Sequence, residues 1–298
     1  MMTDKVKNYL HLHVIVFIWG FTAVLGKLIS LDALPLVWYR MSIAVGLILL
    51  FIAFKRISLK VAPKDLVWMG IAGIVIALHW VTFFSAIKVS NVSVALATLS
   101  TGAFFTALLE PFWYGRKIIA YEILFGIIVM GGLYIIFNVE TQYAKGIMYG
   151  LISALLSAIF SLINGKLAKT NKPSVISFYE LGLGVLFLTV YLGFNNRFTA
   201  SFFEVSANDW LFLAILASIC TAYAFIASVK VMKFLTPYTV MLTINLEPIY
   251  GIILAFILLG DSEKMNPLFY LGALLILSTV IANGLLKNTH LLKKRSRS

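Results

Sequence analysis

The sequence predicts an all-α integral membrane protein whose ten transmembrane helices form two inverted five-helix repeats. Three observations lead to this prediction: the composition, the spacing of the apolar runs and the distribution of charge. Apolar residues make up 61% of the 298 residues and charged residues only 12%, with a mean hydropathy of +0.97. A soluble domain is about half apolar and about a quarter charged. The composition therefore excludes a soluble globular enzyme and a disordered protein.

The apolar residues fall into ten runs, each long enough to cross a bilayer core, which requires about 20 residues per helix. The runs are continuously apolar, which disfavours a β-barrel, because barrel strands alternate polar and apolar residues. The first run lacks a small-residue cleavage site, so we interpret it as a retained helix rather than a signal peptide. The expected helices cover residues 9–29, 35–54, 66–86, 92–113, 119–138, 145–166, 174–194, 210–229, 236–258 and 266–286.

The charge distribution predicts which side of the membrane each connection occupies. Ten spans place both termini on one side, and we expect that side to be the cytoplasm. Of the 24 basic residues, 18 then lie inside, five lie outside and one, Arg40, lies within a helix, as the positive-inside rule requires. Because these residues sit in short connections, we expect no nucleic-acid partner; the expected partners are the lipid bilayer and a small-molecule substrate. The protein should lie in the plasma or inner membrane, with a basic cytoplasmic tail at 287–298.

The two halves of the sequence resemble each other. Residues 86–105 align without gaps on residues 231–250. Five helices is an odd number, so the second unit, 145–286, should be inverted in the membrane relative to the first, 9–138. Inverted repeats are common in secondary transporters, which bind their substrate near the membrane midplane between the halves. The aligned pairs include Thr98 with Thr243, Gly115 with Gly260, and Arg40 with Glu180.

Three motifs carry a resemblance to a known family. They are Trp19-Gly20-Phe21 in the first helix, Tyr39-Arg40 at the start of the second, and the stretch 246–261, in which a proline precedes an apolar run that ends in Gly-Asp. Together they resemble the drug/metabolite transporter superfamily, and its EamA family in particular, over almost the whole chain. The first repeat departs from the pattern, since Ala103 aligns with Pro248. The resemblance implies export or exchange of small metabolites, amino acids or drugs without ATP.

Glu247 is the most informative candidate for a functional residue. It lies near the middle of its expected helix, where a charge costs about 2.5–3.5 kcal/mol, so it should face a cavity, be paired or be protonated. Thr243 and Tyr250 share its face by helical spacing, Pro248 should kink the helix beside it, and Asn245 lies off that face. We hypothesise that Glu247 contributes to substrate binding, proton coupling or both. The alternative is a structural Glu bonded to a neighbouring helix.

Other polar and aromatic side chains give weaker signals. Arg40 and Glu180 begin helices on opposite sides of the membrane, so we do not expect them to pair. Arg40 could bind an anionic substrate group through its planar guanidinium, or extend to the lipid headgroups. His79 could relay protons or serve packing alone. Trp19 and Trp80 could stack on a substrate, although most aromatic residues in such chains anchor the helices at the membrane interface.

Small and polar residues form stripes on three of the expected helices. Thr22 lies on a stripe of the first; the stripe of the fourth contains Ser93, Ala97, Ser100 and Thr101, and that of the sixth contains Ser153, Ser157 and Asn164. Such stripes are typical of helix–helix packing surfaces. The same residues would also suit the wall of a pathway for polar solutes.

The sequence lacks the signatures of several other activities. It contains no GxxxxGK[ST] loop for nucleotide hydrolysis, so transport would depend on gradients or be facilitated. One cysteine and four scattered histidines indicate neither a disulfide nor a metal site, and we expect no cofactor. A secondary transporter is the favoured function. The alternatives are an integral membrane enzyme acting on lipids, which would need clustered His, Asp or Glu, and a channel, which would need a filter or charged ring.

Overall fold

A computed structural model describes residues 4–115, 120–235, 240, 243–244 and 246–295. These residues are helical or in turns, with no strand among them, so the all-α class is confirmed for the part described. The first half consists of α1 (Asp4–Leu28), α2 (Ala33–Phe54), α3 (Pro63–Val89), α4 (Val92–Leu99), α5 (Gly102–Tyr114) and α6 (Ala120–Val139). The second half consists of η1 (Thr141–Tyr143), α7 (Ala144–Thr170), α8 (Pro173–Phe194), α9 (Ala200–Phe203), α10 (Ala207–Ala217), η2 (Ser218–Tyr223), α11 (Ala224–Val231), α13 (Glu247–Leu259), η3 (Gly260–Glu263) and α14 (Pro267–Arg295).

Seven helical segments within the described residues are long and apolar enough to cross a membrane. Two further apolar helices are shorter, Leu124–Val139 and Pro267–Thr279. The expected number of ten therefore remains a prediction. The seven segments are Val6–Leu28, Ala33–Phe54, Pro63–Val89, Val92–Tyr114, Thr141–Thr170, Pro173–Phe194 and Ala207–Val231.

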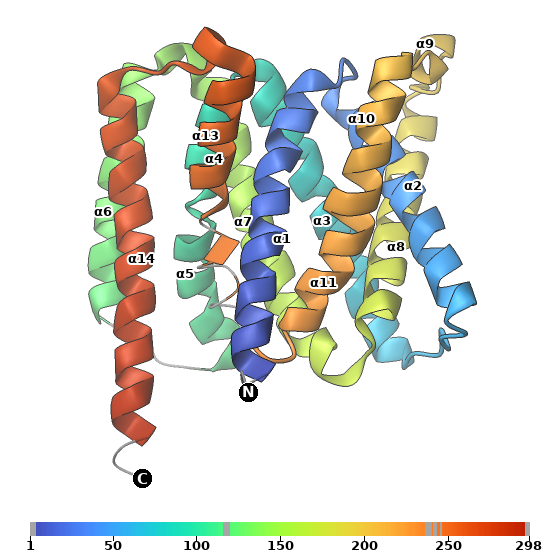
Figure 1. Ribbon diagram of the computed structural model, residues 1–298, viewed down its shortest axis with the longest axis horizontal. Helices are drawn as coiled ribbons and strands as arrows, with labels where there is room; N and C mark the ends of the chain where they lie inside the picture. Colours follow the sequence, from blue (N-terminus) through green and yellow to red (C-terminus); the bar gives the residue numbers. More distant parts are fainter. Residues whose placement is uncertain (1–3, 116–119, 236–239, 241–242, 245, 296–298) are drawn as a thin grey trace.

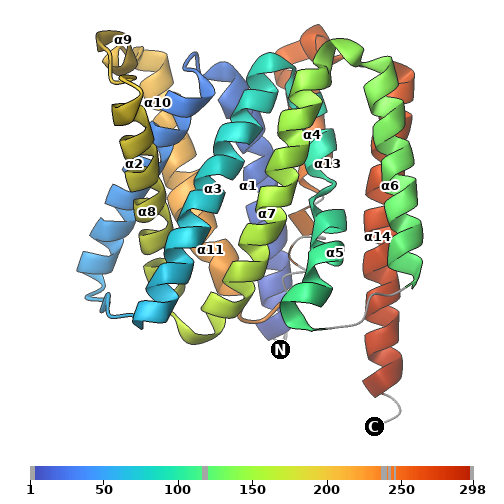
Figure 2. The same ribbon diagram turned by 180° about the vertical axis from the view of Figure 1, so that it is seen from behind.

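The helices stand roughly side by side in one bundle (Figure 1). The start of α1 and the end of α14 lie at the same end of this bundle, as an even number of crossings requires. Helices α6 and α14 pack together at one edge, and α2 lies at the other, as the reverse view also shows (Figure 2). Helices α3 and α7, one from each half, pack against each other in the middle.

Two of the expected continuous helices are interrupted. The expected helix 92–113 divides into α4 and α5 at Ser100 and Thr101, whose hydroxyls donate to the backbone oxygens of Ala97 (2.5 Å) and Thr98 (2.7 Å). The prediction that Glu247 lies in the middle of a helix is wrong, because α13 begins at Glu247. Pro248 occupies the first turn of α13, where backbone N–H groups have no partner within the helix, so its lack of an N–H costs no hydrogen bond.

Smaller differences concern the second half. The expected helix 210–229 contains the π-helical turn η2, in which the Thr221 hydroxyl donates to the backbone oxygen of Leu216 at 2.7 Å. The connection 195–209 holds the short helix α9. Helix α14 continues to Arg295, so the expected tail at 287–298 begins as a helix.

Several elements recur in both halves with equal length and in the same order. Helices α2 and α8 each contain 22 residues, and the residues with positive φ that follow them, Arg56 and Asn196, are 140 positions apart. Helices α5 and α13 each contain 13 residues. Each of these ends at a glycine with positive φ, Gly115 and Gly260, as the sequence alignment pairs them.

Candidate functional site

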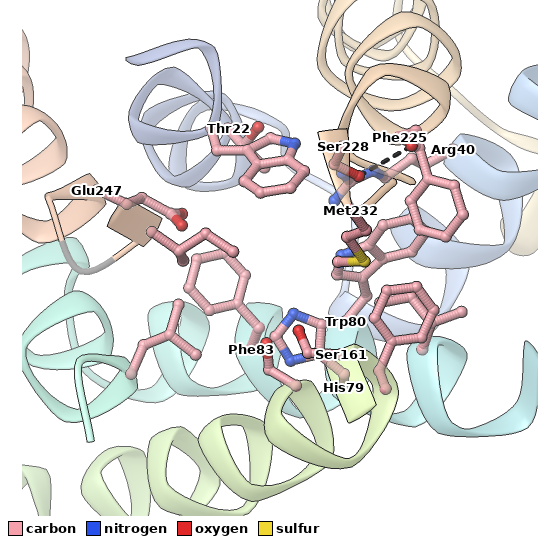
Figure 3. Close-up of a pocket in the computed structure, with 16 residues that line it drawn as sticks. Thr22, Arg40, His79, Trp80, Phe83, Ser161, Phe225, Ser228, Met232 and Glu247 are labelled. Atoms are coloured by element: carbon pink, nitrogen blue, oxygen red, sulfur yellow. Dashed lines mark hydrogen bonds between the residues drawn. The ribbon is translucent and has the colours of Figure 1, made fainter. Parts of the chain in front are cut away.

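A mainly apolar cavity with a few polar and ionisable side chains in its wall lies inside the bundle, lined by both halves of the chain (Figure 3). Its volume is about 70 Å³, and on this measure one water molecule needs about 10–15 Å³, so several fit. The first half contributes Trp19, Thr22, Arg40, His79, Trp80 and Phe83, among others. The second half contributes Ser157, Ser161, Phe225, Ser228, Met232 and Glu247, among others.

Arg40 lies two turns inside α2 and is 1% exposed, so it does not extend to the headgroups. Its Nε donates to the Thr221 hydroxyl at 2.6 Å. The guanidinium carbon lies 4.0 Å from the ring centre of Trp80, a cation–π contact worth about 2 kcal/mol where water is excluded. Among the described residues, buried Nη1 has no hydrogen-bond partner and no carboxylate pairs with the side chain. Arg40 is therefore a fixed buried cation with donor capacity left for a ligand.

Glu247 faces the same cavity from the opposite side (Figure 3). It is 6% exposed, and no hydrogen bond or ion pair to its carboxyl is found among the described residues. Because α13 begins here, its carboxyl lies at the positive end of a helix dipole, which favours negative charge. The expected position of Glu247 in its helix was wrong, whereas the expectation that it faces a cavity agrees with the structure.

His79 and Trp80 form the α3 wall of the cavity. The His79 Nδ1 lies 2.9 Å from the backbone oxygen of Ser153 and 2.8 Å from its hydroxyl, and that hydroxyl donates to the His79 backbone oxygen at 3.0 Å. These bonds join α3 to α7, so Ser153 has the packing role that its stripe predicted. Because both ring contacts use Nδ1, Nε2 is the ring nitrogen left for a ligand in the cavity.

Glu180 lies outside the cavity, in a dry contact between α7 and α8. It is 0% exposed, and its Oε1 accepts a hydrogen bond from Asn164 Nδ2 at 2.9 Å. As expected, it does not pair with Arg40, which bonds to Thr221 instead. Glu180 is therefore separated from the residues that can touch a solute in the cavity.

The remaining predicted residues have different positions. Trp19 lines the cavity. Thr243 and Pro248 are buried but do not line the cavity. Tyr250 packs with its ring centre 5.6 Å from that of Phe17, against α1. Asn245 lies outside the described residues.

Sequence reasoning missed several side chains of the cavity wall, or assigned them to packing. Thr22 and Ser157 belong to stripes interpreted as packing surfaces. Phe225 and Ser228 in α11 gave no signal, because nothing in a run of apolar and small residues distinguishes a cavity wall from a helix contact. Thr22, one turn after Trp19, carries a buried hydroxyl in the cavity wall, a feature that only the structure shows.

The fold and the cavity together define a class of protein. It is a helical membrane protein in which two halves of the chain line a cavity whose wall carries a buried cation and a buried acid.

The chain belongs to the EamA-like transporter family, whose sequence profile matches residues 7–138 and again residues 144–284. It is therefore a multi-pass membrane protein of a transporter family.

Curated relatives of this chain are also described as transporters. An uncharacterized transporter of Archaeoglobus fulgidus is 26% identical over 271 residues, which cover 86% of this chain and 90% of that protein. One of Clostridium kluyveri is 24% identical, covering 84% and 83%. The uncharacterized transporter YxxF of Bacillus subtilis (strain 168) is 23% identical, covering 67% of this chain and 65% of that protein. The match therefore spans about two thirds of the Bacillus protein.

One solved crystal structure has the same fold. It superposes with a TM-score of 0.68, covering 94% of this chain and 97% of the other, at 15% sequence identity.

Proposed function

We propose that this protein is a secondary transporter that moves small solutes by alternating access, without ATP. Its ten helices would form two inverted five-helix repeats, with both termini in the cytoplasm and the boundary near residues 139–145. Three features support this arrangement: the equal lengths of α2 and α8 and of α5 and α13, the two profile matches, and the two termini at one end of the bundle.

The observation that carries the proposed function is the pair of opposite charges across the cavity. Arg40 on one side and Glu247 on the other are both buried, and among the described residues neither has an ion-pair partner (Figure 3). A buried charge is costly unless it is paired. A solute with a carboxylate at one end and an ammonium group at the other would pair with both. The solute class is therefore a small zwitterion, with the aromatic rings of the wall around its apolar part.

Alternating access requires that one end of the bundle opens while the other is closed. At the end opposite the termini, carboxylates of the second half bind backbone N–H groups of the first. Asp209 accepts from the Ser30 backbone N–H at 2.7 Å and from its hydroxyl at 2.5 Å. Glu263 accepts from the backbone N–H groups of Val92 (3.2 Å) and Ser93 (2.9 Å). These bonds hold that end closed and would break when the cavity opens outward.

The test uses three solutes with the same hydrocarbon body and different charges. Proteoliposomes containing the purified protein are loaded with leucine, and exchange of labelled leucine is measured with unlabelled leucine, 4-methylpentanoate or 3-methylbutylamine as inhibitor. We expect leucine to inhibit most strongly, because only leucine presents both charges. Equal inhibition by all three compounds would contradict the zwitterion assignment, and the absence of exchange for leucine, glycine and phenylalanine alike would contradict it as well.

Glu247→Gln separates the two roles of this residue, because glutamine keeps the shape and hydrogen bonding but cannot ionise. If Glu247 binds the ammonium group, the variant should lose exchange. If it carries a coupling proton, the variant should keep exchange and lose accumulation driven by a pH gradient. Wild-type exchange together with wild-type accumulation would show that Glu247 is structural. Thr243→Ser, a change beside the cavity rather than in its wall, is the matched control.

A further inference from the structure

The Glu180–Asn164 contact contains two acceptor atoms that lack a donor. Asn164 Nδ2 donates to Glu180 Oε1 at 2.9 Å. Glu180 Oε2 and Asn164 Oδ1 are both buried, and neither has a hydrogen-bond partner among the described residues. Both residues are 0% exposed, so bulk water does not reach them. An unpaired buried acceptor costs about 1–3 kcal/mol, more if it is charged.

A single proton satisfies both atoms. Protonation of Glu180 on Oε2 would turn this unpaired acceptor into a donor, and we infer that Asn164 Oδ1, the other unpaired acceptor of the contact, accepts it. Exchanging the oxygen and nitrogen of the Asn164 amide does not remove the need for the proton. The amide oxygen would then face Oε1, and two acceptors in contact also require a hydrogen between them.

The surroundings offer no counter-charge that would favour the carboxylate. Helices α2, α3, α7 and α11 pack against α8. The ionisable side chains that these helices carry towards the membrane interior are engaged elsewhere: Arg40 binds Thr221, and His79 binds Ser153. Lys166 and Lys230, on α7 and α11, are exposed. Next to Glu180, α3 contributes Gly73, which has no side chain at all.

The contact is linked to the cavity through one face of α7. Ser157 and Ser161 line the cavity, and Asn164 follows Ser161 by one turn on the same face, since residues three and four apart are neighbours on a helix. A movement of α7 that reshapes the cavity wall would therefore also change the distance between Asn164 and Glu180. Separation of Asn164 from Glu180 would take the hydrogen-bond acceptor away from the Glu180 O–H and let water reach it.

We propose that Glu180 and Asn164 form a proton-binding site, and that this proton is the coupling ion of the transporter; the second part rests on the proposed function. The proton comes from water on the side to which the site is open and binds Glu180 Oε2. It returns to water when α7 and α8 separate towards the other side. Only the O–H bond forms and breaks. Solute binding between Arg40 and Glu247 and proton binding at Glu180 thus use different residues.

Infrared difference spectroscopy of the purified protein tests the first part without any solute. The C=O stretch of a carboxylic acid is resolved from the bands of a carboxylate. We expect Glu180→Gln to remove an acid band at neutral pH, Glu180→Asp to shift it, and Glu247→Gln to leave it in place. Asn164→Leu should also shift this band, because it removes the hydrogen bond. Loss of a carboxylate band instead of an acid band in Glu180→Gln would overturn the proposal, as would an unshifted acid band in Asn164→Leu.

Glu180→Gln should fold, because its side-chain amide can donate to Asn164 Oδ1 as the protonated acid does. In proteoliposomes, this variant should keep leucine exchange and lose accumulation driven by a pH gradient, with Glu180→Asp retaining part of it. Full accumulation by Glu180→Gln would overturn the coupling role. Failure of the wild type to exchange leucine would refute the proposed function instead, and the infrared result would still decide whether the proton is bound.

Discussion

Replacing Gly73 by alanine should destabilise the protein, because α3 and α8 cross at this residue. A methyl group there would lie 2.3 Å from the backbone oxygen of Glu180 and 3.1 Å from the backbone nitrogen of Gly184. Neither backbone atom can rotate away as the end of a side chain can. Restoring an ordinary contact of 3.4 Å requires the two helices to separate by about 1 Å. This separation would displace Glu180 from the contact that it makes with α7.

The expected magnitude follows from two opposing effects. Overpacking of a well-packed contact costs about 1–3 kcal/mol, and the backbone clash favours the upper part of that range. Alanine is better than glycine in a helix by about 1 kcal/mol. The net loss is therefore about 1–2 kcal/mol in the free energy of unfolding. Gly70→Ala, one turn earlier on α3, is the matched control. Its methyl group would meet only Leu183 Cδ1 at 3.5 Å, so this variant should be as stable as the wild type or more stable.

Cys220 gives the assay a natural probe. It is the only cysteine of the chain and is 3% exposed, so a fluorogenic thiol reagent reacts with it only when the helices separate. In detergent, Gly73→Ala should react at a lower temperature than the wild type, and Gly70→Ala at the same or a higher temperature. If Gly73→Ala unfolds at or above the wild-type temperature, the close crossing of α3 and α8 is wrong.

Two further predictions concern the cavity and its closed end. Arg40→Met should weaken inhibition of exchange by leucine about 10- to 100-fold, which corresponds to the loss of one hydrogen bond to a charged group. Arg40→Lys should weaken this inhibition less, because lysine keeps the charge but loses the planar contact with Trp80. Equal inhibition in the wild type and both variants would argue against Arg40 as the anion site. Glu263→Gln should loosen the end of the bundle opposite the termini. The reporter is a cysteine at position 22 (Thr22→Cys, with Cys220→Ser), which should then react faster with an impermeant maleimide added from that side. An unchanged labelling rate would show that Glu263 is not part of the closure.

The sequence was sufficient for the all-α membrane class and for the cavity residues that stand out chemically, whereas the ten helices and the inverted repeats remain predictions. Continuous apolar runs and the sparse charges predicted membrane helices, because a bilayer leaves few other structures possible. Five of the ten candidate side chains line the cavity: Trp19, Arg40, His79, Trp80 and Glu247. They were recognisable because a polar or ionisable group inside a membrane is costly and must face a partner or a cavity.

The helix interruptions and the remaining cavity residues depend on how the helices pack, which the sequence alone does not show. The helix interruptions at Thr101 and Glu247 occur within apolar runs, so hydropathy alone predicted continuous helices. Ser228 and Phe225 line the cavity because of how α11 is rotated, and its neighbours decide that rotation. Tyr250 lies one turn after Glu247 in α13, yet it packs against Phe17 of α1 instead of lining the cavity.

Arg40 and Glu180 show how two similar halves of a chain can place different side chains in different surroundings. They occupy equivalent positions in α2 and α8, two helices of 22 residues. In an inverted repeat, such positions lie at equal depths from opposite faces of the membrane. In the proposed inverted arrangement, equivalent depths therefore hold a cationic Arg40 in one half and the acid Glu180 in the other, and the surroundings of the two side chains differ. Arg40 lies beside Trp80 and the cavity, where a cation gains from the aromatic ring and from a solute. Glu180 is fully buried, its carboxyl accepts a hydrogen bond from Asn164, and its backbone lies against Gly73 of α3. An arginine at position 180 would find no carboxylate or aromatic face there, so exchanging the two side chains should abolish folding rather than invert the direction of transport.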